Sequence, residues 1–248
     1  KMIKKFIDKL LGKTPGGARG SKKPSFGKRE EAGADVHGIN PELVDRRASD
    51  VVRTLKQAGF EAYIVGGAVR DLLVGLRPKD FDVATNATPE QVKGLFRRAF
   101  IIGRRFRIVH VVYGRGREHE VIEVSTFRAY LDNAAAEQVA GNEKTSKSEL
   151  AGMHHAVDST GRVLRDNVWG PMEEDAVRRD FTINAMYYDP ETQVVVDYHK
   201  GIQDAKKRTL RMIGDPAVRY REDPVRIIRA VRFAAKLSPL GFTLDTKT

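Results

Sequence analysis

The sequence predicts an α/β (α+β) protein, in which a small mixed β-sheet of roughly five strands is flanked by helices and followed by a helical neck. Three observations predict this fold class. A strand, a glycine pair, a short helix and a second strand follow one another between Tyr63 and Thr85. Two runs rich in valine and isoleucine, Ile108–Tyr113 and Glu120–Ser125, flank a glycine-containing turn and are typical of paired strands. Apolar stripes at helical spacing before and after these strands predict helices that cover the sheet.

The stretch from Tyr63 to Thr85 contains the first candidate site. Its strands are predicted at 63–65 and 81–84, with a helix at 68–74 between them. Asp80 and Asp82 stand at the start of the second strand. Residues two apart on a strand share a face and lie roughly 6.5–7 Å apart. Two carboxylates on one face, beside a Gly66-Gly67 turn that exposes backbone N–H groups, suit a magnesium-bound triphosphate.

Composition narrows the classes of partner. The 248 residues contain 44 Lys and Arg against 33 Asp and Glu, which gives a net charge of +11. Such an excess favours a polyanion such as nucleic acid or an anionic membrane surface, although many basic proteins bind neither. The absence of cysteine excludes disulfides and Cys-ligated zinc. No apolar run approaches the ~18–20 residues of a membrane-spanning helix, and no signal peptide is visible, so we expect a cytoplasmic protein.

Cap signals place the helices. Asn40 followed by Pro41, and Thr88 followed by Pro89, each predict a helix start. A charged helix is expected over residues 173–188, followed by a strand over 193–198. Asp223 before Pro224 predicts the N-cap of the last helix. The spacing of that helix predicts a buried stripe of Ile227, Ile228, Val231, Ala234 and Ala235.

Two other polar positions attract attention. Glu123 places a charge in the middle of the apolar strand 120–125, where it is either a third acid of the site or part of a salt bridge at its rim. His154 and His155 are adjacent and could suggest a metal site. Neighbouring side chains diverge, however, and no third ligand is near in sequence, so we expect both to be exposed to solvent.

Four separated motifs resemble the class II nucleotidyltransferase family, which holds bacterial poly(A) polymerases and CCA-adding tRNA nucleotidyltransferases. They are G-G-A-V-R-D-L-L-V-G (66–75) with K-D-F-D-V-A-T (79–85), E-V-S-T-F-R (123–128), R-R-D-F-T-I-N-A-M (178–186) and R-E-D-P-V-R-I-I-R-A-V-R-F (221–233). Their order and spacing cover roughly residues 51–242. Local sequences such as G-R-R-F-R-I-V-H-V (103–111) and D-N-V-W-G (166–170) are more similar to the poly(A) polymerase branch.

The resemblance implies a catalytic set. Asp80 and Asp82 would bind Mg²⁺ in a two-metal site, and Glu123 would act as the third acid on the primer 3′-hydroxyl or in a metal shell. Asp180 would be either a further catalytic acid or the buried partner of an arginine. The substrates implied are ATP and an RNA 3′ end.

The remaining motif residues are implied to bind substrate. The nucleotide-binding set is Gly66, Gly67, Arg70, Asp71, Arg179, Asn184, Glu222, Asp223, Arg226 and Arg229. Within this set, Asp223 and Arg226, with Glu222, are implied to read the base edge, because an Asp/Arg pair offers an acceptor and a donor. The candidate RNA- or phosphate-binding cluster is Arg104, Arg105 and Arg107, which could equally supply general electrostatics.

The expected organisation has three parts. Residues 1–38 form a basic, disordered extension, within which 1–13 is either an amphipathic helix that touches a membrane or RNA, or a frayed terminus. Residues 39–213 form the nucleotidyltransferase head, with a mobile insertion at about 132–160. Residues 214–248 begin the helical neck, and we expect a C-terminal remainder to be missing.

Three alternatives to RNA adenylation remain open. The first is a CCA-adding enzyme acting on tRNA, because small rotations of an Asp/Arg pair could exchange A for C selection. The second is a non-catalytic RNA-binding module. The third is an aspartyl-phosphate phosphatase, since the two aspartates of D-F-D-V-A-T have the spacing found in D-x-D-x-T, although the threonine comes one residue later and no hydrophobic strand precedes the motif here.

Overall fold

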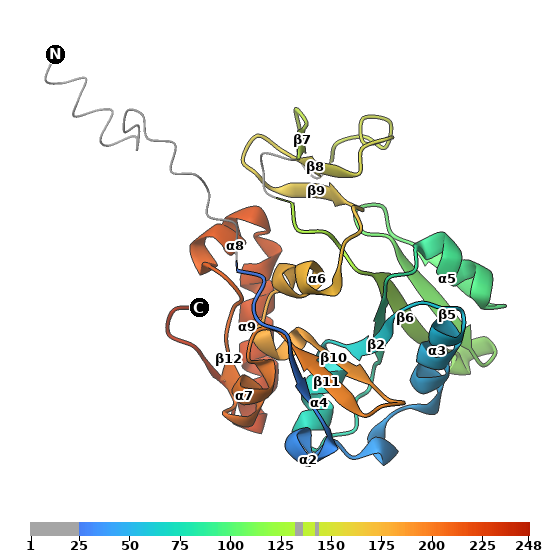
Figure 1. Cartoon of the computed structure of the whole chain (residues 1–248). Coiled ribbons are helices and arrows are strands. Elements are labelled where there is room, and N and C mark those ends of the chain that lie inside the picture. Colours follow the sequence, from blue (N-terminus) through green and yellow to red (C-terminus); the bar gives the residue numbers. More distant parts are fainter. Residues whose placement is uncertain (1–24, 132–135, 142–143) are drawn as a thin grey trace, which may run out of the picture.

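A mixed eight-stranded sheet forms the centre of the protein (Figure 1). The computed structural model describes residues 25–131, 136–141 and 144–248. The strand order is β1-β11-β10-β2-β3-β6-β5-β4, in which β3 and β6 run parallel and the other neighbours run antiparallel. A separate three-stranded sheet, β7-β8-β9, and a two-stranded sheet, β12-β13, complete the β structure described.

The strands of the large sheet are β1 (Glu30–Ala32), β2 (Ala62–Val65), β3 (Asp82–Thr85), β4 (Ala99–Ile102), β5 (Ile108–Tyr113), β6 (Glu120–Thr126), β10 (Met186–Asp189) and β11 (Val194–Asp197). The small sheets are built from β7 (Glu137–Gln138), β8 (His155–Val157), β9 (Val163–Asp166), β12 (Thr209–Leu210) and β13 (Thr243–Leu244). The α-helices are α2 (Ala34–His37), α3 (Arg46–Gln57), α4 (Gly67–Leu73), α5 (Pro89–Leu95), α6 (Met172–Arg178), α7 (Gly201–Lys206), α8 (Pro216–Glu222) and α9 (Val225–Leu237). Short 3₁₀ turns are η1 (Pro41–Leu43), η2 (Gly116–Glu118), η3 (Thr182–Asn184) and η4 (Ser238–Leu240).

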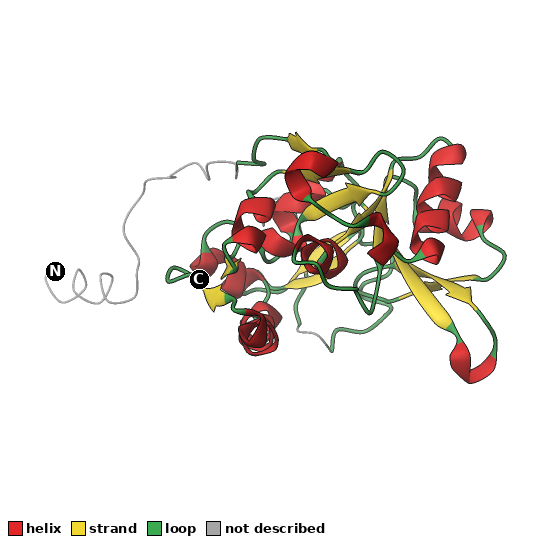
Figure 2. Cartoon of the chain, turned by 90° about the horizontal axis from the view of Figure 1, so that it is seen from below, coloured by secondary structure: helices red, strands yellow, loops and turns green. Residues whose placement is uncertain are grey.

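Helices lie on both sides of the central strands (Figure 2). One face of the sheet packs against α3, α4, α5 and α7, and alternate strand residues such as Ile64, Val83 and Val124 are buried there. The other face packs against α6, whose Met172 and Ala176 lie in one apolar cluster with sheet residues that include Tyr187. Because strand residues alternate between faces, Asp82 and Glu123 belong to the α6 side of the sheet.

The predicted strand–helix–strand unit is confirmed as β2, α4 and β3. Its tight turn depends on Gly66, which has φ +78° and ψ −140°, a conformation that residues with a side chain rarely adopt. The cap at Thr88 is also confirmed, since Thr88 and Gln91 form a capping box at the start of α5. Asn40, by contrast, caps only η1, and the long helix α3 begins later, behind an Asp45 cap.

The helix expected over residues 173–188 is wrong in its second half. Helix α6 ends at Arg178, because Arg179 takes extended angles, with φ −68° and ψ 163°. The chain then enters β10, where Tyr187 and Tyr188 pair with Val65 and Ile64 of β2. The two tyrosines favour a strand, and the central position between β2 and β11 stabilises it over a longer helix.

The sheet is larger than the sequence predicted. Strand β4 was not expected, and β1 lies inside the segment 1–38 that was expected to be disordered. Residues 30–32 pair with 195–197 of β11, and α2 follows directly. The disorder expected for 30–37 is therefore wrong, while the expected amphipathic helix at 1–13 lies outside the described residues.

The segment 132–160 also contains regular structure. Strands β7 and β8 pair in parallel, and β8 pairs with β9. His155 is buried on β8, whereas His154 is exposed, so the expectation of two exposed histidines is wrong for His155. Burial and the nearby Arg178 charge lower the pKa of His155 to about 4.

The buried stripe predicted for the last helix is wrong except at Ala234, which is half-buried against the core. Ile227, Ile228 and Val231 are 50%, 69% and 67% exposed. Helix α9 instead turns Ala230 and Leu237 into the core, and Phe233 packs edge-on against Phe181 with ring centroids 5.7 Å apart. Both stripes have helical spacing, so the sequence period alone could not show which of them faces the sheet.

No helix within the described residues is long and apolar enough to cross a membrane.

Two glycines in helices provide a test of the packing of α7 against η3. An alanine Cβ at Gly201 of α7 would lie 2.4 Å from the Thr182 carbonyl oxygen and 2.8 Å from Met186 Cγ. Because the nearest atom belongs to the backbone, we expect Gly201→Ala to lower the free energy of unfolding by about 1–3 kcal/mol. At Gly94 of α5 an added Cβ would meet nothing within 4 Å, so Gly94→Ala should be neutral or raise it by up to about 1 kcal/mol. Urea unfolding of both variants measures the difference, and equal stability would contradict the packing of α7 against η3.

Candidate active site

Asp82 lies at the meeting point of three elements. It pairs with Val65 of β2 on one side and with Glu123 of β6 on the other. An added Cβ on Gly66 would lie 3.9 Å from Asp82 Oδ2, so the glycine turn and the carboxylate are neighbours. The predicted adjacency of Asp82, the Gly66-Gly67 turn and Glu123 is therefore present, with Asp80 two residues before Asp82.

The surroundings of Asp82 favour its neutral form. Its side chain is accessible to solvent, but protein surrounds it closely. This partial burial, followed by the negative charges of Glu123 and Asp80, raises the pKa of Asp82 to about 6, while Arg179 acts in the opposite direction. A cation placed among these acids would stabilise the charged form.

The carboxylates of Asp80 and Asp82 fit a hard divalent cation. Both side chains are exposed, and neither forms a hydrogen bond or ion pair with the rest of the described chain. Mg²⁺ accepts carboxylate oxygens and completes its shell with water and phosphate oxygens. No group of three or more His, Cys, Asp or Glu side chains in the described ranges is arranged to hold a metal by itself. The donor set therefore suits an ion that arrives with a substrate phosphate.

Glu123 has a partner that the sequence analysis missed. Nε2 of His110, directly across on β5, lies 3.2 Å from Glu123 Oε1. This contact holds the carboxylate on the open face of the sheet, beside Asp82. Pairing the two predicted strands about their glycine turn would have placed His110 opposite Glu123, so the signal was present in the sequence.

Asp180 is the buried partner of an arginine, which was one of its two predicted roles. Its Oδ2 accepts a 2.6 Å hydrogen bond from Arg229 Nε, and its Oδ1 accepts one of 2.8 Å from the Phe181 backbone N–H. The pair connects α9 to the turn after α6. A direct catalytic role for Asp180 stays a prediction, as does nucleotide contact by Arg229.

Arg70 is held inside the protein. Its Nη1 donates to Asn184 Oδ1 at 2.8 Å, and its Nε and Nη2 donate to Asp71 Oδ1 at 3.0 and 2.9 Å. The guanidinium lies 5.8 Å from the ring centre of Phe233. Asp71 therefore orients Arg70, but only 3% of the Arg70 side chain is exposed, so contact with a phosphate requires it to leave these partners.

Arg179 belongs to a triad with two residues absent from the sequence analysis. It forms an ion pair of 3.1 Å with Asp175, and its Nε donates to the Tyr187 hydroxyl at 3.3 Å. That hydroxyl donates in turn to Asp175 at 2.7 Å. The positive charge of Arg179 acts on the acid site, where it opposes the rise in the pKa of Asp82.

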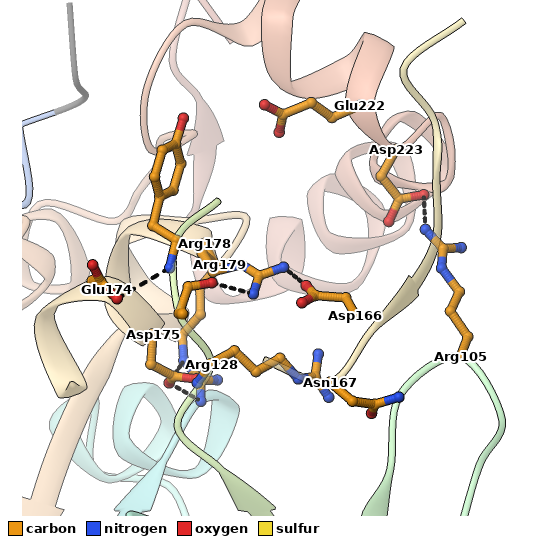
Figure 3. Close-up of polar contacts among 12 residues, drawn as sticks. Arg105, Arg128, Asp166, Asn167, Glu174, Asp175, Arg178, Arg179, Glu222 and Asp223 are labelled. Carbon is orange, nitrogen blue, oxygen red and sulfur yellow. Dashed lines mark hydrogen bonds and ion pairs between the residues drawn. The ribbon is translucent and has the colours of Figure 1, made fainter. Parts of the chain in front are cut away.

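Four further arginines gather between α6, α8, α9 and the end of β6. This arginine cluster consists of Arg128, Arg178, Arg219 and Arg226 (Figure 3 shows Arg128 and Arg178). Burial and mutual repulsion lower the pKa of Arg178 to about 9. The pKa values of Arg128 and Arg219 fall to about 10, chiefly through burial and then partly through neighbouring arginines.

Acidic residues hold the arginine cluster together. Asp166, fully buried on β9, pairs with Arg178 (Figure 3). Glu222 Oε2 lies 3.2 Å from both Arg219 Nη1 and Arg226 Nη1. Asp166 and Arg219 were not predicted. The Asp166–Arg178 pair thereby attaches the three-stranded sheet to α6. Loss of either partner would leave an uncompensated buried charge.

The predicted base-reading residues lie close together, but Asp223 and Arg226 have separate partners. Asp223 Oδ1 lies 3.7 Å from Arg105 Nη2 (Figure 3) and 3.4 Å from the Val225 backbone N–H, at the start of α9. Arg226 donates to the carbonyl oxygens of Arg219 and Arg178 at 2.9 and 3.3 Å. Recognition of a base edge by the two residues stays a prediction.

The predicted cluster of Arg104, Arg105 and Arg107 is not a single patch. Arg105 points to Asp223 and stacks 4.8 Å from the ring centre of Phe106, whereas Arg107 pairs with the exposed Glu90. Arg104 is exposed at the turn between β4 and β5. The Arg107 backbone N–H in this turn donates to Asn167 Oδ1 at 3.1 Å, and the charge of Arg105 contributes to the lowered pKa of Arg128 in the arginine cluster.

A mixed sheet with an acid pair beside a glycine turn defines a nucleotidyltransferase type of site. Consistent with this, residues 62–211 match the Poly A polymerase head domain family, and the chain belongs to that family.

The most informative relatives agree with this assignment. Poly(A) polymerase I of Haemophilus influenzae is 50% identical over 200 residues, covering 80% of this chain and 40% of that protein. The CCA-adding enzyme of Lactobacillus helveticus is 37% identical over 202 residues, covering 82% of this chain and 43% of that protein. The crystal structure of the Bacillus stearothermophilus CCA-adding enzyme in complex with CTP aligns with a TM-score of 0.59 and 34% identity, covering 81% of this chain and 40% of that one. The chain therefore spans well under half the length of these relatives.

The raised pKa of Asp82 gives a testable link between the acid site and stability. Because its pKa of about 6 in the folded protein exceeds the ordinary value of 3.8, the folded state binds the proton more tightly. Without divalent cations, ionised Asp82 therefore destabilises the fold above about pH 6, and this penalty disappears as the pH falls toward 4. Asp82→Asn should thus have the higher melting temperature at neutral pH in EDTA, with a smaller difference in acid.

Melting curves between about pH 8 and pH 5, with and without Mg²⁺, measure this effect. Mg²⁺ should raise the melting temperature of the unmodified protein and leave Asp82→Asn unchanged. Glu42→Gln, an exposed change on η1, is the charge-matched control. A lower melting temperature for Asp82→Asn than for the unmodified protein at neutral pH would contradict the electrostatic description of this site.

Proposed function

We propose that this chain contains the catalytic head of an enzyme that adds AMP from ATP to RNA 3′ ends without a template. The observation that carries the proposal is the exposed Asp82 carboxylate, which lies beside the Gly66 turn and in register with Glu123. The identity to Poly(A) polymerase I of Haemophilus influenzae, 50%, exceeds the 37% to a CCA-adding enzyme and supports adenylation.

Each part of the site has a role in this reaction. Asp80 and Asp82 would hold Mg²⁺, which when bound would activate the attacking hydroxyl and stabilise the leaving pyrophosphate. Glu123, fixed by His110, would accept a hydrogen bond from the primer 3′-hydroxyl and orient it. The backbone N–H groups at Gly66 and Gly67 would approach the triphosphate, and the charge of Arg179 would offset its negative charge.

The arginine cluster and Asp223 would recognise the base. Arg226 is fixed by two carbonyl oxygens and Glu222, so its position is preorganised for a base edge. Asp223, whose Oδ1 lies 3.7 Å from Arg105 Nη2, supplies an acceptor nearby. Such an arrangement offers both hydrogen-bond polarities to a base. We further propose that the protein acts in the cytoplasm and that residues 1–13 contribute a weak RNA or membrane contact.

CCA addition is the second candidate, because a CCA-adding enzyme bound to CTP shares the fold at 34% identity. Incubating the protein with each nucleoside triphosphate separately, with either oligo(A) RNA or a tRNA lacking its 3′ end, distinguishes the two. Long tails made from ATP alone support adenylation. Extension that requires CTP and stops after three nucleotides would replace it with CCA addition.

The acid pair can be tested directly. Asp80→Ala or Asp82→Ala should abolish AMP incorporation while RNA binding stays nearly unchanged, because the carboxylates hold the metal rather than the RNA. Radiolabelled ATP incorporation and RNA gel shifts measure the two properties. Glu61→Ala, an exposed acid beside β2, serves as the control, and full activity in either aspartate variant would disprove the two-carboxylate mechanism.

A further inference from the structure

The large sheet has an open face beside the acid site. Helix α6 covers the α6 side of the sheet around Val65, Tyr187 and Val196. Farther along the same side, β4 forms the edge of the sheet. Phe100 and Ile102 of β4 are 54% and 43% exposed there. Isolated exposed apolar residues are common on protein surfaces, so exposure alone indicates no function.

The register of the strands aligns this face with the acid site. Asp82 pairs with Glu123, Glu123 pairs with His110, and His110 pairs with Phe100. Paired residues in a ladder point to the same face, so these four side chains form one row across four strands. With neighbouring strands ~4.8 Å apart, Phe100 lies about 10 Å from Glu123 and about 14 Å from Asp82.

Positive charge flanks the aromatic end of the row. Arg98 has the same parity as Phe100 and Ile102 along the chain, and its guanidinium bonds to the carbonyl oxygen of Gly114. Arg104 is exposed at the opposite end of β4. An aromatic ring between two cationic side chains matches the alternation of bases and phosphates in single-stranded nucleic acid. A protein strand docking on the edge of β4 would have no comparable use for these charges.

We propose that Phe100 is a stacking platform for an RNA base a few nucleotides upstream of the primer 3′-hydroxyl. This inference rests on the proposed function, because it assumes that the 3′-hydroxyl lies at Glu123. The backbone of the primer would then cross β5 above His110 and reach β4, where Phe100 stacks on a base and Arg98 and Arg104 attract the phosphates. Phe100 is a positioning residue for the primer and touches neither ATP nor the reacting atoms.

Binding of fluorescein-labelled oligo(A) RNA, followed by anisotropy without ATP, tests the platform. Phe100→Ala should weaken binding about 5- to 150-fold, because alanine substitution of a stacking residue costs that range per base. Phe100→Trp should restore the affinity. Val36→Ala, on α2, removes a side chain with the same 54% exposure away from the row and should leave binding unchanged.

Kinetics and base deletion sharpen the test. Phe100→Ala should raise KM for the primer and leave KM for ATP and kcat at saturating primer unchanged, because the ring contacts only the RNA. Abasic sites placed at each of the last few primer positions should reveal one position whose loss weakens binding to the unmodified protein. Removing the base at that position should not weaken RNA binding by Phe100→Ala any further, as a double-mutant cycle requires for a direct contact.

The outcomes separate this inference from the proposed function. If the unmodified protein transfers AMP but Phe100→Ala binds primer normally, the platform is wrong and the function stands. If no nucleotide is incorporated but Phe100→Ala weakens RNA binding and Phe100→Trp restores it, the RNA surface stands and the proposed function fails. A change in oligomeric state without a change in RNA affinity would assign Phe100 to a protein interface and overturn the inference.

Discussion

The parallel pairing of β3 with β6 is the contact on which the site depends. It places Asp82 beside Glu123, and the partial burial of Asp82, followed by the charges of Glu123 and Asp80, raises the pKa of Asp82 to about 6. A bound cation would offset the repulsion among these acids. The same register extends through β5 to β4, so one set of backbone hydrogen bonds determines both the acid site and the row that ends at Phe100.

Positive charge is concentrated in the arginine cluster, between α6, α8, α9 and the end of β6. Arginines of the cluster lower one another's pKa values, and buried acids such as Asp166 hold them in place. Asp166 comes from the three-stranded sheet and Glu222 from α8. Asp175, which accepts a hydrogen bond from the Arg128 backbone N–H, comes from α6, so the cluster joins three parts of the chain. An arrangement with repelling like charges is expected where an anionic substrate completes the balance. This is why we propose a role in nucleotide binding for the cluster in addition to stability.

Local signals in the sequence predicted several elements correctly. Thr88 and Gln91 define a capping box, and the glycine pair defines the turn between β2 and α4. The apolar run 120–125 located Glu123 on a strand, where the structure places its side chain on the face opposite the core. Prediction from the sequence failed where the local pattern fits two structures equally well. Residues 179–188 could continue a helix, and α9 has two apolar stripes, so only the surrounding strands and core decided the outcome.

The sequence by itself determined the fold class, the acid motif and the family, because these depend on residue types at short, fixed spacing. Only the tertiary structure decided which charges meet. Asp82 and Glu123 are 41 residues apart, and Arg70 and Asn184 are separated by 114 residues, so their contacts depend on strand pairing and helix packing rather than on local pattern. The alignment of Phe100 with the acids has the same origin, since nothing in the chain near Phe100 indicates that His110 and Glu123 lie between it and Asp82.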